Sequence, residues 1–271
     1  MDDTDDFAYH GMMLGFIVKK TFYDLWDNMA RIVLLNLGFI TSLAIPFLLP
    51  SAVPIPLLSF GIFVAGILWC CIYLSAAALS VKALSDYSIF GFADFRDNLK
   101  AGWPAGIAMG IIGFFLFSMA RIIIPFYLDM GSLFGFLLAA IIFWTLVLGL
   151  VSFQFFFAVR ARLDTKILKI AKKCLMIFFD NPGFAVFSLL YTIVTLVLSL
   201  ILALLLPGPA GMLLFLDEAL RLRLLKYDWL EANPPADDSA RRKIPWDAIL
   251  IEEREKTGTR SLRNFIFPWK D

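Results

Sequence analysis

The residues with most chemical potential in this sequence are charged side chains inside an otherwise apolar chain. Arg121 lies toward the far end of the apolar run 104–127, and Asp217 and Glu218 follow a Pro-rich turn at the same predicted side. Ionisable groups at membrane depth are costly and by default suggest a functional site. We expect Arg121 to pair with Asp217 or Glu218. The pair would either hold the bundle together, which is the commoner role, or line an outward-open polar cavity.

Other residue types offer little for catalysis. The single histidine, His10, precedes the first apolar run and is expected to be a surface residue. The sequence has no phosphate-binding glycine loop, metal-ligand cluster or nucleophile motif. Its three cysteines (Cys70, Cys71 and Cys174) are interpreted as small packing residues. We therefore expect no enzyme, no cofactor, no metal site and no nucleic-acid partner.

The elements that must position these side chains are membrane spans. Of the 271 residues, 60% are hydrophobic and only 17% are charged, and the mean hydropathy is +0.80. Soluble domains carry about 25% charged residues. Runs long enough to cross a hydrocarbon core of about 30 Å are residues 30–50, 57–81, 104–127, 132–159 and 183–206. This composition predicts an all-α, polytopic helical membrane protein. Asn36 and Gln154, polar residues within the spans, are expected to form helix–helix hydrogen bonds.

The connections between the runs differ in charge. Basic residues gather before residue 30, in 82–103 and in 160–173, whereas 50–56 is uncharged and 125–132 holds only Asp129. The positive-inside rule places the basic segments in the cytoplasm. We therefore expect the N-terminus and the polar tail of the chain to lie in the cytoplasm. The acidic start lacks the basic region of a cleavable signal peptide, so the first span should be retained.

The basic connections also show helical periodicity. In 161–179 apolar residues recur every three or four positions, and Lys166, Lys169 and Lys173 occupy another face. This pattern predicts an amphipathic helix at the bilayer surface. Its expected role is to anchor the bundle, with a specific lipid-headgroup site as the alternative. Shorter amphipathic helices are expected within 1–29 and 89–100.

A short pattern precedes three of the spans. An apolar residue stands five positions before an Asp-Asn pair and another stands two positions before it, at Asp27-Asn28, Asp97-Asn98 and Asp180-Asn181. Asp or Asn at such a corner could cap the helix that begins there. The pattern predicts three units, each with an amphipathic helix, a corner, an outward span, a Pro-bearing turn and a return span. In this scheme 211–226 is a short sixth span.

The sequence divides into three regions. Residues 1–29 form an amphipathic N-terminal segment, 30–226 the transmembrane bundle and 227–271 a polar cytoplasmic tail. In the tail a Pro-rich linker precedes a segment with an aromatic anchor near each end, Trp246 and Trp269. Aromatic anchors of this kind suit docking on the protein's own cytoplasmic face or binding of another protein, and the sequence favours neither.

Parts of this sequence resemble the YesL-like family of bacterial membrane proteins (domain of unknown function 624). The resemblance rests on Asn36 and Pro46 in "NLGFITSLAIP", on the small-residue exit "LSAAALSVKAL" and on "FADFRDNLKAGW", and it covers residues 20–225. It implies an integral inner-membrane protein with an accessory role in carbohydrate ABC transport, and ABC-transporter permease subunits as partners. It carries over no catalytic residues. The polar tail after residue 231 departs from the family's compact pattern.

Three functional interpretations follow. The first is a non-enzymatic accessory or regulator of a carbohydrate ABC transporter, engaged through the cytoplasmic helices and the tail. The alternative is a small transporter or channel with a polar site between helical repeats. A continuous cavity lined by Arg121, Asp217 and Gln154 would favour transport, and a dry core would favour the accessory role. A membrane enzyme acting on lipid is the weakest of the three.

Overall fold

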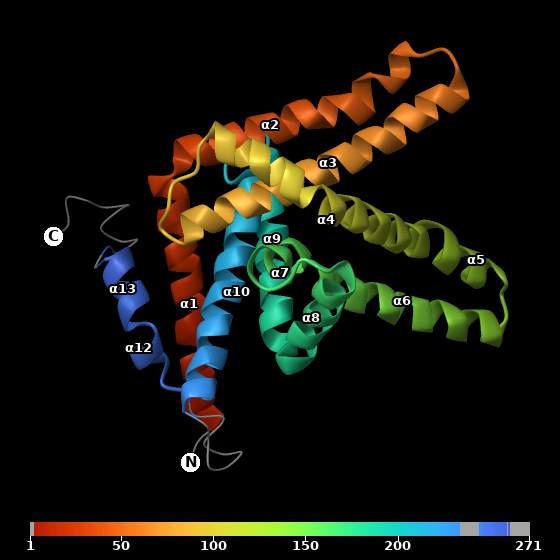
Figure 1. Ribbon diagram of the computed structural model, residues 1–271. Coiled ribbons are helices and arrows are strands. Elements are labelled where there is room, and N and C mark those ends of the chain that lie inside the picture. Colours follow the sequence, from red (N-terminus) through yellow and green to blue (C-terminus); the bar gives the residue numbers. More distant parts are fainter. Residues whose placement is uncertain (1–2, 234–243, 259, 261–271) are drawn as a thin grey trace. The chain divides into compact units, whose positions relative to one another are not determined.

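The computed structural model describes residues 3–233, 244–258 and 260, and the elements in this part of the chain are helices (Figure 1). The chain folds as two compact units. Unit 1 consists of Met1–Met29 and Glu218–Asp271, and unit 2 of Ala30–Asp217. The boundaries between the units lie at 29/30 and 217/218, so the N-terminal segment and the tail belong to one unit. The predicted division into 1–29, 30–226 and 227–271 by membrane location stays a prediction.

Unit 2 begins with an antiparallel helix pair, α2 (Met29–Leu48) and α3 (Pro56–Ser85), joined by the short helix η1 (Pro50–Ala52) (Figure 1). Small residues let the two helices approach closely. A Cβ on Gly38 would lie 2.1 Å from the Tyr73 hydroxyl oxygen. That hydroxyl donates a hydrogen bond of 2.8 Å to the carbonyl of Leu35. The pair is therefore held by close packing and by one buried polar contact.

The next pair is formed by one long helical rod and α6 (Leu133–Phe153) (Figure 1). The rod comprises α4 (Phe92–Ser118), the π-helical segment η2 (Met119–Ile123) and α5 (Ile124–Asp129). Pro125 explains the π turn, because proline has no N–H to donate to the carbonyl of Arg121 and its ring crowds that carbonyl. Gly131, with φ +59°, lies in the turn to α6. Ser132 then caps α6 by accepting a hydrogen bond from the Gly135 N–H.

The rest of unit 2 contains α7 (Phe156–Arg162), α8 (Ile167–Asp180), α9 (Pro182–Ile201) and the first half of α10 (Gly208–Ala232). Asn36 closes the turn between α9 and α10. Its amide nitrogen donates to the carbonyls of Leu205 (3.0 Å) and Pro207 (2.9 Å), and its amide oxygen accepts from the Ala210 N–H (2.9 Å). The expectation that Asn36 hydrogen-bonds another helical segment is confirmed.

The described residues contain five helical stretches long and apolar enough to cross a membrane, Met29–Ala52, Pro56–Ser85, Phe92–Asp129, Leu133–Arg162 and Pro182–Ile201. They correspond to the five predicted runs, and the all-α polytopic fold is confirmed. Large apolar side chains on these stretches are exposed, as lipid-facing helices require; Leu57 and Leu133 are more than four-fifths exposed. α10 is not in this set, because charged residues occupy its middle. The sixth crossing stays a prediction.

Two of the predicted Asp-Asn corners coincide with helix boundaries. α8 ends at Asp180, and the Asn181 side chain caps α9 by accepting from the Phe184 N–H at 2.9 Å, as expected. α1 (Asp3–Asp27) ends at the first corner, but the Asn28 amide donates to the carbonyl of Asp24 at 3.0 Å. The Asn28 side chain therefore binds a carbonyl in the last turn of α1, and it does not cap the helix that follows the corner.

The corner predicted at Asp97-Asn98 is wrong, because both residues lie inside α4. This helix already begins after Gly91, whose N–H donates to the Asp94 carboxylate at 2.7 Å. Asn98 donates sideways to the Ser80 hydroxyl of α3 at 3.0 Å, so its amide is satisfied without ending the helix. The amphipathic helix expected at 89–100 is thus the first part of α4. The three-unit internal repeat stays a prediction.

Unit 1 combines α1, the second half of α10 and two short tail helices, α12 (Trp246–Ile249) and α13 (Ile251–Thr257). α1 confirms the predicted N-terminal helix, and its buried face includes Met13, Phe16 and Ile17. α13 ends before Gly258, whose φ of +77° suits the predicted glycine cap. None of the five candidate spans lies in the described part of this unit.

Candidate functional site

Two adjacent acids on α10, Asp217 and Glu218, take part in two separate buried ionic clusters. Successive residues of an α-helix point about 100° apart, so neighbouring side chains meet different partners. Asp217 is the last residue of unit 2 and Glu218 the first of the second segment of unit 1. Both side chains are almost completely buried.

The first cluster, here called the Arg162 cluster, consists of Arg162, Asp217, Asp86 and Ser85. The Arg162 Nε donates to Asp217 Oδ1 at 2.9 Å, and its Nη2 donates to the other oxygen of the same carboxylate. Nη1 donates to Asp86 Oδ1 and Nη2 to Ser85 Oγ, each at 3.0 Å. This bidentate arrangement satisfies a buried carboxylate and joins the ends of α3 and α7 to α10. Burial raises the pKa of Asp217, and Arg162 opposes that shift.

The second cluster, here called the Lys20 cluster, consists of Lys20, Thr21, Asp24 and Glu218. The first three belong to α1, where Lys20 and Asp24 share a face at i, i+4 spacing and Thr21 is adjacent to Lys20. Lys20 Nζ binds the carboxylates of both Asp24 and Glu218, the latter at 3.3 Å. Thr21 Oγ1 donates to Glu218 Oε2 at 2.6 Å. The side chains of Lys20 and Glu218 are fully buried.

The Lys20 cluster brings two carboxylates to one ammonium group. Burial raises the pKa of Glu218 well above its ordinary value, whereas Lys20 lowers it, and Asp24 adds to the increase. A cluster of this composition takes up a proton more readily than an exposed carboxylate does. The described residues contain no group of three or more His, Cys, Asp or Glu side chains that could hold a metal ion.

The predicted pairing of Arg121 with Asp217 or Glu218 is wrong. Arg121 lies in the π-helical segment with an exposed side chain, and no described residue forms a hydrogen bond or ion pair with it. The first half of α10 packs instead on α9, where Phe215 stacks on Tyr191 with ring centroids 3.8 Å apart. Asp217 thereby reaches Arg162 at the end of α7.

Gln154 has the helix–helix role that was expected of it. Its amide nitrogen donates to the carbonyl of Val151 at 2.7 Å and to that of Ala185 in α9 at 2.8 Å. The three residues that would line a transport cavity therefore have separate surroundings. Arg121 is exposed, Asp217 belongs to the Arg162 cluster and Gln154 binds backbone carbonyls.

The amphipathic helix predicted for 161–179 is confirmed as α8. Its buried face carries Ile170, Cys174 and Ile177. Lys166 and Lys169 are exposed, whereas Lys173 Nζ donates to the carbonyl of Leu163 at 3.2 Å and pairs with Asp164 at 3.4 Å. The predicted headgroup contacts of these lysines stay a prediction. A second apolar face is exposed and includes Leu168, Met176 and Phe179, as an interfacial helix requires.

The described part of the tail packs within unit 1. Trp246 is 2% exposed, and Glu253 on α13 pairs with Arg221 on α10 at 2.7 Å. Arg260 pairs with Asp27 at 2.7 Å, and its guanidinium lies 5.5 Å from the centre of the Tyr23 ring. These contacts favour docking of the tail on its own chain. Trp269, the second predicted anchor, lies outside the described residues.

Sequence reasoning missed the basic partners of the two acids. Arg162 lies in the basic segment 160–173, whose charge predicts only orientation, and nothing in its sequence neighbourhood indicates burial. A signal did exist for Lys20. It stands four residues before Asp24 on the same helix as the apolar residues Ile17 and Leu25, and an i,i+4 ion pair beside an apolar stripe suits a buried contact.

Comparison of the chain with models of known protein families, with curated proteins and with solved structures found no match. The resemblance to the YesL-like family therefore stays a prediction. The functional argument depends on the geometry of the two units.

Proposed function

We propose that the chain is a non-enzymatic membrane protein that acts as an accessory or regulatory component of a transporter. Unit 1 would be the part that the partner recognises. The carbohydrate ABC transporter is proposed as the partner on the predicted family resemblance alone. In this proposal the protein lies in a bacterial inner membrane, with α1, α12 and α13 of unit 1 in the cytoplasm.

The observation that carries this proposal is the construction of unit 1. Its described residues include none of the candidate spans, yet three ion pairs join segments that are far apart in sequence: Lys20–Glu218, Arg221–Glu253 and Arg260–Asp27. A chain that needed only to cross the bilayer would have no need of a folded module of this kind. A folded polar module in the same chain as membrane spans suits recognition of another protein.

The surroundings of Arg121, Gln154 and Asp217 support the accessory role over transport. A substrate pathway needs polar groups that face a shared cavity. Asp217 and Gln154 already have protein partners, and Arg121 lies apart from both. The Arg162 cluster is arranged as a structural joint between helix ends.

Site-specific photo-crosslinking in cells would test the proposal. A photoreactive amino acid replaces Ile251, which is 54% exposed on α13 of unit 1, and as a matched control it replaces Phe60, which is 65% exposed on α3 of unit 2. We expect a transporter subunit to crosslink at position 251 and not at position 60, with mass spectrometry to identify it.

Two results would count against the accessory role. One is the absence of any transporter subunit at position 251 under conditions in which the chain is correctly inserted. The other is sugar flux by the purified chain alone in proteoliposomes, which would favour the small-transporter alternative.

A further inference from the structure

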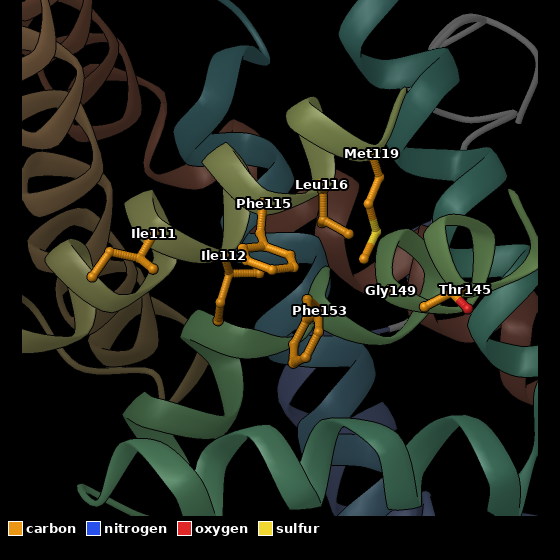
Figure 2. A pocket seen from close by; sticks show the side chains of 8 residues that line it. All are labelled: Ile111, Ile112, Phe115, Leu116, Met119, Thr145, Gly149 and Phe153. Atoms are coloured by element: carbon orange, nitrogen blue, oxygen red, sulfur yellow. The ribbon is translucent and has the colours of Figure 1, made fainter. Parts of the chain in front are cut away.

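Two apolar surfaces of unit 2 lie outside the ionic clusters. One is a groove with a volume of about 300 Å³ between α4 and α6, and the residues that line it in Figure 2 are uncharged. The other is the exposed face of α8, which combines apolar and basic side chains. Charge restricts the kind of partner that a surface can bind, so the α8 face indicates its partner more closely than the groove does.

α8 exposes large apolar side chains on the side that faces away from its packed one. Leu168, Met176 and Phe179 are 86%, 57% and 67% exposed. With an advance of about 100° per residue, Leu168 and Phe179 point within about 20° of the direction opposite the buried Ile170. Contiguous apolar surface is unfavourable in water, so an apolar medium or a partner must cover this face.

Two lysines belong to the same exposed face. Lys172 stands four residues after Leu168 and four before Met176, and Lys169 stands seven before Met176. These spacings put side chains on one side of a helix. Both lysines are exposed, and among the described residues no carboxylate forms an ion pair with either of them. The face therefore carries positive charge among its apolar residues.

Short connections hold α8 between two candidate spans, Leu133–Arg162 and Pro182–Ile201. Before α8, the Asp164 carboxylate accepts hydrogen bonds from the N–H groups of the next two residues at 2.8 and 3.0 Å and pairs with Lys173 at 3.4 Å. After α8, a single residue leads into the next span. The 14 residues of α8, about 21 Å of helix, are therefore held at a membrane boundary at both ends.

We propose that the exposed face of α8 lies in the headgroup region of the bilayer and binds anionic phospholipids through Lys169 and Lys172. An interfacial helix places its apolar side chains about 5–10 Å into the boundary between headgroups and acyl chains. Lysines on the same face extend along this surface and bring their ammonium groups to the phosphates. Charge complementarity identifies the lipid as anionic. This binding does not depend on the accessory role proposed above.

The position of Lys172 favours a bilayer over a protein as the cover of this face. Lys172 lies between Leu168 and Met176, in the middle of the exposed apolar residues. Lysine is depleted in protein interfaces, and charged residues are rare in their cores. A protein on this face would have to bury the ammonium group or supply an acid for it. At a bilayer surface the same group reaches the headgroups and stays hydrated.

The test uses the purified full chain in nanodiscs that contain equal amounts of phosphatidylglycerol and phosphatidylcholine. A fluorescent amino acid replaces the exposed Leu168, and phospholipids brominated on their acyl chains quench it on contact. Two samples differ only in which of the two lipids is brominated. We expect quenching in both, and about fivefold more from brominated phosphatidylglycerol, the value of one contact between a lysine and an anionic lipid surface.

Three variants and one reference position accompany this measurement. Lys169→Gln with Lys172→Gln should abolish the preference for phosphatidylglycerol, whereas Lys169→Arg with Lys172→Arg should keep it. Arg254→Gln with Lys256→Gln removes an equal charge from α13 of unit 1 and should also keep it. The same fluorophore in place of Trp144, which is 67% exposed on the uncharged helix α6, should be quenched equally by both lipids.

Absence of quenching at position 168, with quenching at position 144, would mean that protein or water covers the face and would overturn the proposal. Equal quenching by the two lipids at position 168 would overturn the preference for anionic lipid. A preference that survives the double change to glutamine would overturn the role of Lys169 and Lys172. Both lysines are exposed, so their replacement leaves the packed face of α8 intact.

Discussion

Replacing Lys20 with Met should destabilise unit 1 strongly. The change leaves two buried carboxylates, Asp24 and Glu218, without the ammonium group that both bind. Removing one member of a buried ion pair costs about 3–5 kcal/mol. Protonation of Glu218 would offset part of this cost, so the effect at neutral pH should fall at the lower end of the range.

Hydrogen exchange of the protein in lipid nanodiscs is the appropriate assay, because it reports on each unit separately. Backbone amides of α1 and of α10 beyond Glu218 should lose protection in Lys20→Met, whereas amides of α3 and α6 should not. The matched control is Lys100→Met, because the Lys100–Asp97 pair is exposed, at 71% and 65%. Loss of an exposed pair costs about 0–1 kcal/mol.

The Lys20 cluster also predicts the direction of a pH effect. Because the pKa of Glu218 is raised above 4.5 in the folded protein, the folded state holds this proton more tightly than the unfolded state. The contribution of Glu218 to stability is therefore greatest below pH 4.5. It declines as pH rises through the folded pKa, by at most about 1.4 kcal/mol per pH unit for one proton.

The variant Glu218→Gln isolates this effect. Glutamine keeps an oxygen that can accept a hydrogen bond from Thr21, but it cannot titrate. As pH rises, the unfolding free energy of the unmodified protein should therefore fall relative to that of Glu218→Gln. The reasoning is refuted if the difference is independent of pH between 4.5 and neutrality, or if Lys20→Met is as well protected as Lys100→Met.

Three further substitutions test the joints of the fold. Arg162→Gln should lower the free energy of unfolding by about 3 kcal/mol, since it leaves Asp217 buried without its bidentate partner, and thermal unfolding followed by fluorescence would measure this. Trp246→Ala should cost about 3–5 kcal/mol locally and should speed proteolysis of the tail while the spans stay resistant; an unchanged cleavage rate would contradict the docked tail. Asn36→Leu removes three hydrogen bonds at the α9–α10 turn and should cost about 2–3 kcal/mol, against no measurable change in denaturant midpoint for Thr41→Val on the same helix.

The spans could be predicted from the sequence because the requirement that creates them is local. A helix that crosses a bilayer needs about 20 consecutive, mostly apolar residues, and such a run can be recognised directly in the sequence. The same holds for α8, because the three- and four-residue spacing of its apolar residues determines which residues share a face of the helix. The cap at Asn181 was predictable for a similar reason, since an Asn followed by Pro182 is a local signal for a helix start.

The ionic clusters could not be predicted because partner choice depends on tertiary packing. The sequence predicted Arg121 as the partner of Asp217, and Arg162 belonged to a segment read only for its positive charge. The packing of α10 on α9 instead brings Asp217 to Arg162. The prediction of a corner at Asp97-Asn98 was wrong for a related reason. The residue pattern there matches that of the other two corners, but α4 has already begun after Gly91. The Asn98 amide donates to the Ser80 hydroxyl of α3.

The π turn ahead of Pro125 has a consequence for chain length. A π turn contains one residue more than the α-helical turn it replaces, so in evolutionary terms it corresponds to a single-residue insertion. A homologous chain with one residue fewer between Phe115 and Pro125 would lack the extra residue of this turn, and the residues after the deletion would move about 100° around the rod relative to α4. A one-position gap in an alignment would therefore distinguish chains that keep the π turn from those that have lost it.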